Sequence, residues 1–306
     1  QPSSEANVPP TSATTFDVIV IGAGPVGENV ADRTVQGGLS TLIVEKELVG
    51  GECSYWACIP SKALLRSGAA LRAARAVPGS REAATGDLDV SAVLARRDSY
   101  VSGWSDDGQV AWLSDAGIEL VRGHARLTGE REVTVGETTY SARVAVVVAT
   151  GSAALLPDIP GLADAEPWTS REATSVERIP ESITIIGGGV VAVEIATAYT
   201  DLGAQVTLVA RSTVLGGFEE FAGEAVVAAL RSRGATIITG ASPTGVARAA
   251  SGLVTVTLDD GRTLESSELL VATGRVPRTG DVGLETAGLE SGAWIDVDDT
   301  MLVRGS

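Results

Sequence analysis

Residues 16–46 read FDVIVIGAGPVGENVADRTVQGGLSTLIVEK, and this stretch decides the fold. It opens with a continuous apolar run, reaches glycines at positions 22, 24 and 27, and continues through a segment of helical spacing to a second apolar run. Uninterrupted apolar runs are typical of strands that are buried on both faces of a parallel sheet. The stretch therefore predicts a β-α-β unit with a glycine-rich turn between its first strand and its helix.

The glycine-rich turn predicts a binding site for a dinucleotide. Gly22 and Gly27 permit a tight turn and close packing of the helix on the strand, while Gly24 lets the backbone approach a pyrophosphate. The unpaired N–H groups at the start of the helix favour such an anion. Glu45 ends the second strand, where a carboxylate can bind both hydroxyls of an adenosine ribose.

A second copy of this unit lies 165 positions further along the chain. Residues 182–211 read SITIIGGGVVAVEIATAYTDLGAQVTLVAR and align with residues 17–46 without a gap. Gly187, Gly189 and Ala192 take the places of the three glycines of the first copy. The chain is therefore predicted to carry two nucleotide-binding units.

The two copies differ at the end of the second strand, where Ala210 stands in the place of Glu45 and Arg211 follows it. A carboxylate at this position would repel a phosphate on the ribose 2′ oxygen, whereas a small residue beside a guanidinium can accept one. The second copy is therefore predicted to prefer NADP(H) over NAD(H). The alternative interpretation is that Arg211 is a solvated surface charge.

The sequence between and after the two copies predicts helices, a β-meander and two returning strands. Residues 91–117 show apolar spacing near 3.6, and short apolar segments with glycine turns follow them. Two apolar runs end alike, in Ala-Thr-Gly at residues 149–151 and again at residues 272–274. We expect these runs to be strands that return the chain to each sheet. The proline-rich residues 155–168 and residues 275–283 are predicted to be linkers.

Composition limits the classes of partner. The 306 residues carry a formal net charge of −16, which disfavours nucleic acid and anionic membrane as partners. No apolar run approaches the roughly 18 residues of a spanning helix. Residues 1–15 lack the pattern of a secretory signal and are expected to be disordered. We therefore expect a cytoplasmic protein.

Cys53 and Cys58 are the only cysteines of the chain, within GGECSYWACIPSK at residues 50–62. A bridge closing so short a loop removes little chain entropy, so redox chemistry is a better reason for the pair than stabilisation. Cys58 enters a predicted helix with Pro60 near its first turn, where free N–H groups favour a thiolate. Two thiols and the single histidine, His124, cannot complete a tetrahedral zinc site, and no metal is expected. A structural disulfide and a metal-binding pair remain the alternatives.

Taken together, these motifs resemble the FAD-dependent pyridine nucleotide-disulfide oxidoreductases, a family that includes glutathione reductase, dihydrolipoamide dehydrogenase and mercuric reductase. The resemblance runs from about residue 16 to residue 303 and rests on GAGPVG with Glu45, GGECSYWACIPSK, GGGVVAVE and both Ala-Thr-Gly segments. It implies an α/β fold of two Rossmann-like, doubly wound dinucleotide-binding domains, each with a β-meander. Members of the family continue into a C-terminal dimerisation domain, which this chain is expected to lack.

The resemblance also implies a role for each residue of the redox segment. Cys53 would be the thiol that attacks the acceptor, and Cys58 the thiol that contacts the flavin. Lys62 would lie near the flavin N5 atom and pair with Glu194. Cys58 and Lys62 are four residues apart, so one helix face can present both. The alternative is that Lys62 and Glu194 are solvated surface charges.

The resemblance implies that residues 16–159 form the first part of an FAD-binding domain, residues 160–279 an NAD(P)H-binding domain, and residues 280–306 a truncated return to the first. The positions expected to contact FAD or NAD(P)H are Gly22, Gly24, Pro25, Gly27, Glu45, Lys46, Gly51, Lys62, Ala125, Thr150, Gly151, Gly187, Gly189, Val190, Val191, Glu194, Arg211, Thr273 and Gly274.

The expected activity is passage of a hydride from NAD(P)H through FAD to a Cys53–Cys58 disulfide, and on to a small-molecule or small-disulfide acceptor. We expect a homodimer where the dimerisation domain is present. The segment departs from the family pattern at Glu52, Tyr55 and Trp56, and the two aromatic side chains are expected to narrow the approach to the thiols. His124 lies in a turn and is not expected to be catalytic. The alternatives are a non-catalytic nucleotide-binding fragment without the family's acid-base histidine, and a metal-ion reductase of the mercuric type.

Overall fold

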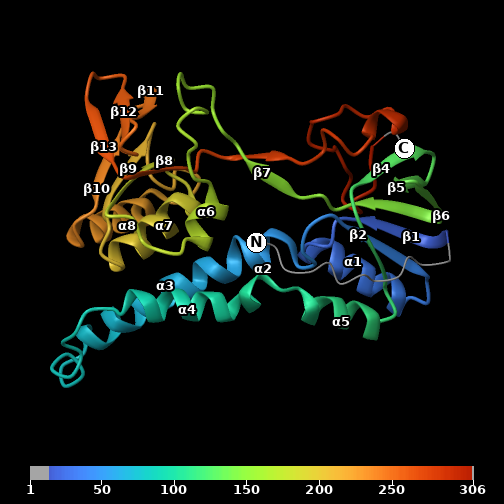
Figure 1. Cartoon of the computed structure of the whole chain (residues 1–306), viewed down its shortest axis with the longest axis horizontal. Coiled ribbons are helices and arrows are strands. Elements are labelled where there is room, and N and C mark those ends of the chain that lie inside the picture. Colours follow the sequence, from blue (N-terminus) through green and yellow to red (C-terminus); the bar gives the residue numbers. More distant parts are fainter. Residues whose placement is uncertain (1–13, 305–306) are drawn as a thin grey trace. The chain divides into compact units, whose positions relative to one another are not determined.

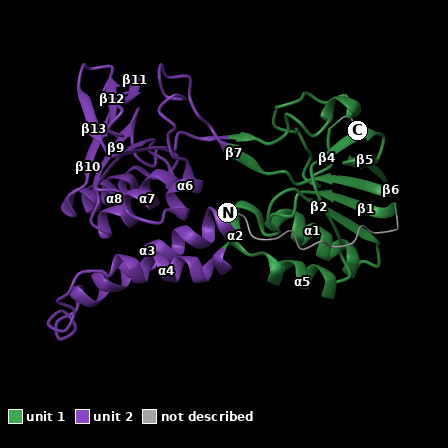
Figure 2. Cartoon of the chain, in the orientation of Figure 1, with its two compact units in different colours: residues 1–53, 104–153, 276–306 green, residues 54–103, 154–275 purple. Residues whose placement is uncertain are grey.

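The computed structural model describes residues 14–304, which divide into two compact units (Figure 2). Unit 1 takes the chain up to residue 53, then residues 104–153, and then the chain from residue 276. Unit 2 holds residues 54–103 and 154–275. Residues 1–15 are expected from the sequence to be disordered. Of these, residues 1–13 lie outside the described part of the chain, and Thr15 begins a strand.

Unit 1 is built on one six-stranded sheet in the order β3-β2-β1-β6-β5-β4 (Figure 1). Its first strand pairs in parallel with β2 and β6, while β4, β5 and β6 form the expected antiparallel meander within the same sheet. The strands are β1 (Thr15–Ile21), β2 (Thr41–Glu45), β3 (Glu119–Arg122), β4 (Ala125–Gly129), β5 (Glu132–Val135) and β6 (Thr138–Val148).

The parallel strands of unit 1 are apolar on both faces, and they are covered by helices on one face and by the meander with residues 282–284 on the other. One apolar cluster packs Val18 and Val20 against Ala31 and Leu113, and a second cluster packs Ile19 on the other face. The helices of this part are α1 (Pro25–Gln36), α2 (Gly51–Tyr55), which crosses into unit 2, α5 (Asp107–Asp115) and the 3₁₀ turn η2 (Leu284–Ala287). The chain around η2 contributes Leu284 to the second cluster.

Unit 2 has a four-stranded parallel sheet in the order β10-β9-β8-β14 and a three-stranded antiparallel sheet in the order β11-β12-β13. The parallel strands are β8 (Ser182–Ile186), β9 (Gln205–Ala210), β10 (Thr236–Thr239) and β14 (Glu268–Val271). The antiparallel strands are β11 (Pro243–Arg248), β12 (Val254–Leu258) and β13 (Thr263–Ser266). The helices are α3 (Cys58–Ala76), α4 (Val90–Tyr100), α6 (Ser170–Ser175), α7 (Val190–Asp201) and α8 (Glu220–Ser232). The α/β fold and the meander-type sheet expected in each half are confirmed.

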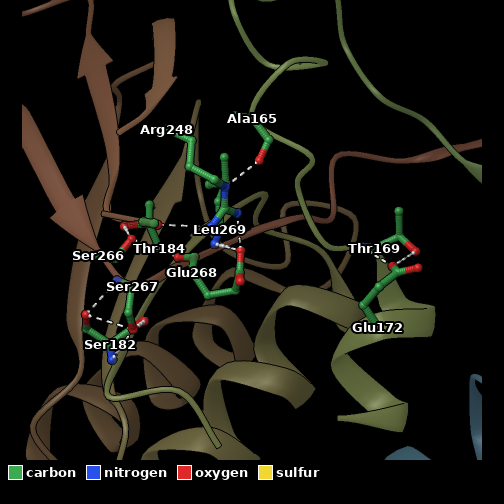
Figure 3. Close-up of polar contacts among 11 residues, drawn as sticks. Ala165, Thr169, Glu172, Ser182, Thr184, Arg248, Ser266, Ser267, Glu268 and Leu269 are labelled. Carbon is green, nitrogen blue, oxygen red and sulfur yellow. Dashed lines mark hydrogen bonds and ion pairs between the residues drawn. The ribbon is translucent and has the colours of Figure 1, made fainter. Parts of the chain in front are cut away.

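Paired serines fasten β8 to the turn between β13 and β14 (Figure 3). The N–H of Ser182 donates to Oγ of Ser267 at 3.0 Å, and the N–H of Ser267 donates to Oγ of Ser182 at 2.9 Å. Oγ of Ser266 donates to Oγ1 of Thr184 at 2.9 Å in a buried contact. Each polar group is satisfied without water, so the two sheets meet in a fixed register.

The expected linker at residues 155–168 is packed rather than loose. Leu162 and Ala165 are buried in an apolar cluster of unit 2, and Nε of Arg248 donates to the Ala165 carbonyl at 2.8 Å. The N–H of Val246 donates to the carbonyl of Pro160. Apolar residues between the prolines therefore make this segment part of the core. Where the chain passes between the units, β7 (Ser152–Ala154) and β15 (Arg275–Pro277) pair as a two-stranded sheet.

Two further expectations differ in detail from the structure. The helical stretch predicted at 91–117 is interrupted by the 3₁₀ turn η1 (Ser102–Trp104), since Gly103 adopts a left-handed conformation with φ 58°. Residues 54–103 group with unit 2 rather than with the first nucleotide unit, because the α3–α4 hairpin packs Leu64 and Val93 on the core around α7. In the described part of the chain, no helix has the length and apolar character needed to cross a membrane.

The internal repeat is visible as backbone hydrogen bonds that recur at the offset of 165. Equivalent bonds join the glycine turn to the end of the second strand and to the loop beyond it in both units. They are Gly22 N–H to Val44 O with Gly187 N–H to Val209 O, and Gly50 N–H to Ala23 O with Leu215 N–H to Gly188 O. The duplication therefore extends past the two strands and includes the loop that follows each of them.

Candidate nucleotide and redox sites

The glycine turn of unit 1 approaches its neighbours too closely for any side chain at two positions. A Cβ on Gly22 would lie 2.4 Å from the carbonyl oxygen of Ala149, and one on Gly27 would lie 1.9 Å from the oxygen of Gly22. A Cβ on Gly24 would meet no atom within 4 Å. The turn is thus closed on the protein side and open at Gly24, where α1 begins with Pro25. This cradle is the form that a pyrophosphate requires.

Glu45 is buried at the end of β2 and orders the backbone beside the cradle. Its Oε2 accepts the N–H of Ala23 at 2.8 Å, and its Oε1 accepts the N–H of Glu47 at 2.8 Å. Each carboxylate oxygen keeps a lone pair with which a ribose hydroxyl could bond. The next residue, Lys46, is exposed.

Other positions expected to contact the first nucleotide lie along the same edge of unit 1. Gly51 sits against the glycine turn, since a Cβ there would be 2.9 Å from Cα of Gly24. Thr150 and Gly151 lie two and three residues beyond the end of β6, and the Gly151 carbonyl accepts the N–H of Arg278 at 3.0 Å. Ala125 is buried as the first residue of β4.

Glu28 is a feature of this edge that the motif reading missed. Its Oε1 is buried and has no hydrogen-bond partner among residues 14–304. Burial, with the nearby Glu45 carboxylate as a second cause, raises the pKa of Glu28 to about 7. The signal in the sequence is the repeat itself, because the equivalent residue at the offset of 165 is the buried Val193.

Unit 2 presents a cavity of about 800 Å³ at its own glycine turn. A Cβ on Gly187 would lie 2.2 Å from the oxygen of Ala272, whereas one on Gly189 would meet no atom within 4 Å. Val190 and Val191 start α7 at the cavity wall and are partly exposed. The turn is therefore closed at Gly187 and open at Gly189, as the turn in unit 1 is closed at Gly22 and open at Gly24. In unit 2 the open side faces the cavity, which is large enough for a nucleotide.

Arg211 lines this cavity directly after β9. The residue is exposed, and its guanidinium has no hydrogen-bond or ion-pair partner in the described part of the chain. Ala210 lies against Gly188, whose Cβ position would be 3.0 Å from the Ala210 methyl. No carboxylate therefore occupies the place that Glu45 fills in unit 1. Ser212 and Thr213 complete this wall with hydroxyl groups.

The returning strand of unit 2 also reaches the cavity. Thr273 and Gly274 line it, and Oγ1 of Thr273 donates to the Leu155 carbonyl at 3.0 Å. The N–H of Leu155 in turn donates to the Gly274 carbonyl at 2.9 Å. These bonds order the cavity rim through the packed segment that follows β7.

The two cysteines lie on consecutive helices. Cys53 is half-buried within α2, and Cys58 is exposed as the first residue of α3. Pro60 is the third residue of α3, which confirms the predicted helix start. Ala57 between the helices has φ −138° and ψ −97°, so the chain breaks its helical path just before Cys58.

Lys62 and Glu194 form the pair that the family resemblance implies, although the lysine is not buried. Nζ of Lys62 lies 2.7 Å from both carboxylate oxygens of Glu194, and Oγ of Ser61 donates to the same carboxylate at 3.1 Å. The lysine side chain is 61% exposed and that of Glu194 is 25% exposed. The contact fastens α3 to α7, the helix that follows the glycine turn of unit 2.

His124 belongs to unit 1, in the turn between β3 and β4. Its Nε2 is 3.1 Å from the carbonyl oxygen of Asp281, and its side chain is 41% exposed. Across residues 14–304, no group of three or more histidine, cysteine, aspartate or glutamate residues is arranged to hold a metal ion.

Comparison with known proteins assigns the chain to a family. The family model described as pyridine nucleotide-disulphide oxidoreductase matches residues 16–304. The chain belongs to this family. Its members depend on FAD and a pyridine nucleotide.

Two curated oxidoreductases illustrate the range of relatives. A mercuric reductase of Lysinibacillus sphaericus is 30% identical over 294 residues, which cover 95% of this chain and 54% of the relative. A dihydrolipoyl dehydrogenase of Chlorobaculum tepidum is 36% identical over 295 residues, which cover 92% of this chain and 62% of the relative. The chain thus spans between about half and three-fifths of these pyridine nucleotide-disulphide oxidoreductases.

A solved structure shares the fold. It is the Cu(II) complex of the HOCl-induced flavoprotein disulfide reductase RclA from Escherichia coli, with a TM-score of 0.79 and 22% sequence identity. The match covers 94% of this chain and 62% of that one. At this identity the likeness supports the oxidoreductase fold alone.

Proposed function

We propose that this chain forms the FAD- and NADPH-binding part of an NAD(P)H:disulfide oxidoreductase in which Cys53 and Cys58 are the redox pair. The observation that carries the proposal is the attachment of α3. This helix begins with Cys58 and is bonded through Lys62 to Glu194, four residues beyond the start of the helix that follows the second glycine turn. A thiol segment tied to a nucleotide-binding helix is what electron transfer between the two would require.

The residues of unit 1 fit the adenosine and pyrophosphate of FAD. The open side of the turn at Gly24 leaves room for the phosphates, and α1 presents its N–H groups there. Glu45 retains acceptor capacity for the ribose hydroxyls, and its bonds to Ala23 and Glu47 hold it in place. Bound FAD would supply two-electron transfer between the nicotinamide and the thiols.

The chain's own groups would carry the proton and thiol chemistry. In each cycle one NADPH and one proton would reduce the Cys53–Cys58 disulfide to two thiols, and the dithiol would then reduce one disulfide-like acceptor to two thiols. Cys53 would attack the acceptor while Cys58 closes the disulfide. Glu194 would keep Lys62 oriented, because a carboxylate that receives a charged donor fixes its position.

Two features of unit 2 support a preference for NADP(H): the guanidinium of Arg211 is unpaired within the described residues, and position 210 carries no carboxylate. Arg211 lines the cavity without a partner among residues 14–304, and Ala210 leaves the ribose 2′ position without negative charge. A 2′-phosphate could bond to Arg211 and to the hydroxyls of Ser212 and Thr213. Phe218 lines the same cavity and is 57% exposed.

Calorimetric binding of 2′,5′-ADP and 5′-ADP tests the nucleotide preference without any flavin. We expect 2′,5′-ADP to bind more tightly, and Arg211→Ala to weaken it by about tenfold or more while changing 5′-ADP little, because a charge-assisted bond contributes about 1.5–3 kcal/mol. Arg262→Ala, in an exposed turn where Arg262 pairs with Asp260, is the matched control. Equal affinity of the unchanged chain for the two ligands would refute the preference.

Anaerobic reduction of the full-length, FAD-loaded protein tests the redox pair. One equivalent of NADPH should produce a long-wavelength charge-transfer absorbance, and Cys58→Ser should abolish it while leaving the flavin bound. Cys53→Ser should show the absorbance before any NADPH is added, because its Cys58 thiol cannot be held in a disulfide, and it should lose turnover. A flavin that is reduced directly to its bleached form in the unchanged protein would remove the disulfide mechanism.

A metal-ion reductase is the second candidate, because several of the similar proteins are named mercuric reductases. The same two thiols would bind Hg(II), since soft thiolates select such an ion. NADPH oxidation that depends on Hg(II), and not on low-molecular-weight disulfides, would favour this function.

We also propose a cytoplasmic homodimer on the basis of the family resemblance, and light scattering of the full-length protein would test its oligomeric state.

A further inference from the structure

Trp56 lies between the two cysteines and is held from outside its own segment. The guanidinium of Arg171 stacks over the Trp56 ring, with Cζ 4.1 Å from the ring centroid. Oγ1 of Thr174 lies 3.0 Å from the Trp56 carbonyl oxygen and donates to it. Arg171 and Thr174 both belong to α6, so one short helix contacts both the ring and the backbone carbonyl of Trp56.

The backbone contact follows from the position of Pro60. In a continuous helix the carbonyl of Trp56 would accept the N–H of residue 60, but proline has no N–H. The next bond of α3 is made normally, from the N–H of Ser61 to the carbonyl of Ala57 at 3.0 Å. Thr174 therefore supplies a donor to the carbonyl that Pro60 leaves without one. The single proton of its hydroxyl is shared with the Ser170 carbonyl, at 2.8 Å.

The helix that holds Trp56 is itself firmly placed in unit 2. A capping box between Thr169 and Glu172 closes its first turn, with the Thr169 N–H 2.7 Å from the carboxylate (Figure 3). The hydroxyl of the buried Tyr199 donates to the Ala173 carbonyl at 2.7 Å, and burial raises the pKa of Tyr199, so the donor stays protonated. The buried Arg97 donates to the Thr174 and Val176 carbonyls.

We propose that Arg171 and Thr174 are positioning residues for the redox segment, which hold Trp56 so that the chain between the two thiols is already ordered before they pair. The inference rests on the proposed pairing of Cys53 with Cys58. Fixing the ring and backbone of Trp56 removes conformational freedom from the open dithiol, so closing the disulfide costs less entropy. α6 thereby shifts the thiol-disulfide equilibrium toward the disulfide without touching either sulfur.

The reduction equilibrium of the whole chain against glutathione tests the proposal without flavin. Oxidised glutathione takes two electrons from the Cys53–Cys58 dithiol, which forms one disulfide and releases two reduced glutathione molecules. We expect Arg171→Ala to lower the constant for disulfide formation about fivefold, the size expected when about one more residue has to be ordered as the disulfide closes. Arg171→Lys should return it to within about twofold, because an ammonium also binds the face of tryptophan.

Two further variants separate positioning from a general loss of stability. Thr174→Val keeps the shape of the side chain and should lower the same constant, since only the bond to Trp56 and its own helix is lost. Arg178→Ala removes an exposed arginine from the segment just after α6 and should leave the constant unchanged. Hydrogen exchange at the Ser61 N–H, which is bonded to the Ala57 carbonyl, should accelerate in Arg171→Ala and not in Arg178→Ala.

The outcomes distinguish this inference from the function on which it rests. If the unchanged chain forms no disulfide with glutathione, the proposed redox pair fails, and the exchange at Ser61 still reports whether α6 orders the segment. If the disulfide forms with the same constant in Arg171→Ala as in the unchanged chain, the positioning role is overturned. A failure of Arg171→Lys to restore the constant would overturn the part played by the cation.

Discussion

The end of the second strand differs between the two units although the backbone around it is the same. In unit 1, Glu45 closes β2 and accepts the N–H groups of Ala23 and Glu47. In unit 2, Ala210 closes β9 and packs its methyl on Gly188, while the guanidinium of Arg211 faces the cavity. The bonds between turn and strand recur in both units at the same offset. A duplicated scaffold thus keeps its backbone and differs at the one or two side chains that we propose select the ligand.

The third glycine position offers the strongest test of how alike the two turns are. A Cβ at Gly27 would overlap the Gly22 carbonyl at 1.9 Å, whereas Ala192 fills the equivalent place in unit 2 and is fully buried. We expect Gly27→Ala to lower the free energy of unfolding by about 2–3 kcal/mol through overpacking. Ala192→Gly should lower it by about 1 kcal/mol, the helix penalty of glycine.

Urea unfolding of the two variants measures this difference in the whole chain. The free energy of unfolding should fall more in Gly27→Ala than in Ala192→Gly, even though alanine is the better helix former. Equal losses in the free energy of unfolding would mean that the turn in unit 1 can open enough to admit a methyl group. That result would also weaken the inference that the turn is held rigid for a pyrophosphate.

Exchange of the strand-end residue should move ligand preference between the units. Ala210→Glu places the carboxylate of unit 1 into unit 2, where it can accept the N–H of Gly188 as Glu45 accepts that of Ala23. We expect the ratio of 2′,5′-ADP to 5′-ADP affinity to fall by about tenfold, since the new charge opposes a 2′-phosphate. Ala210→Gln has the same shape without the charge and should change the ratio much less. A ratio unaltered by Ala210→Glu would place the 2′ oxygen elsewhere.

The repeat explains how much of the molecule the sequence could predict. Apolar runs and glycine spacing predicted both β-α-β units, the returning strands and the meander, because these depend on local periodicity and close backbone approach. The start of α3 at Cys58 and the Lys62–Glu194 pair also followed, from helix-start rules and from the family resemblance.

The features that sequence reasoning missed depend on contacts between distant segments. The burial of Leu162 in the presumed linker requires a partner near Val246, 84 positions away, and no local pattern reports it. The cation–π contact between Arg171 and Trp56 joins residues that are 115 positions apart. The low exposure of Glu28 could have been found only by asking why a carboxyl stands where the other copy has Val193.

The effect expected at Glu28 depends on pH. Its pKa is raised to about 7 in the folded chain, from an ordinary value of 4.5 in the unfolded chain. Between these values the folded state binds more protons than the unfolded state, so the free energy of unfolding falls as pH rises through this window. Because the side chain is half-buried and partly screened by water, we expect a loss of about 1–2 kcal/mol by pH 8.

Glu28→Gln should remove this loss, because a neutral amide has no proton to give up beside Glu45. The variant should match the unchanged chain near pH 4 and exceed its free energy of unfolding at pH 8, as measured by urea unfolding across the range. Glu137→Gln, at an exposed turn, controls for the change in net charge. A flat difference between Glu28→Gln and the unchanged chain from pH 4 to pH 8 would show that Glu28 titrates normally. The contrast with Val193 would then reflect packing space rather than a buried carboxyl, since both positions lie on the same turn of equivalent helices.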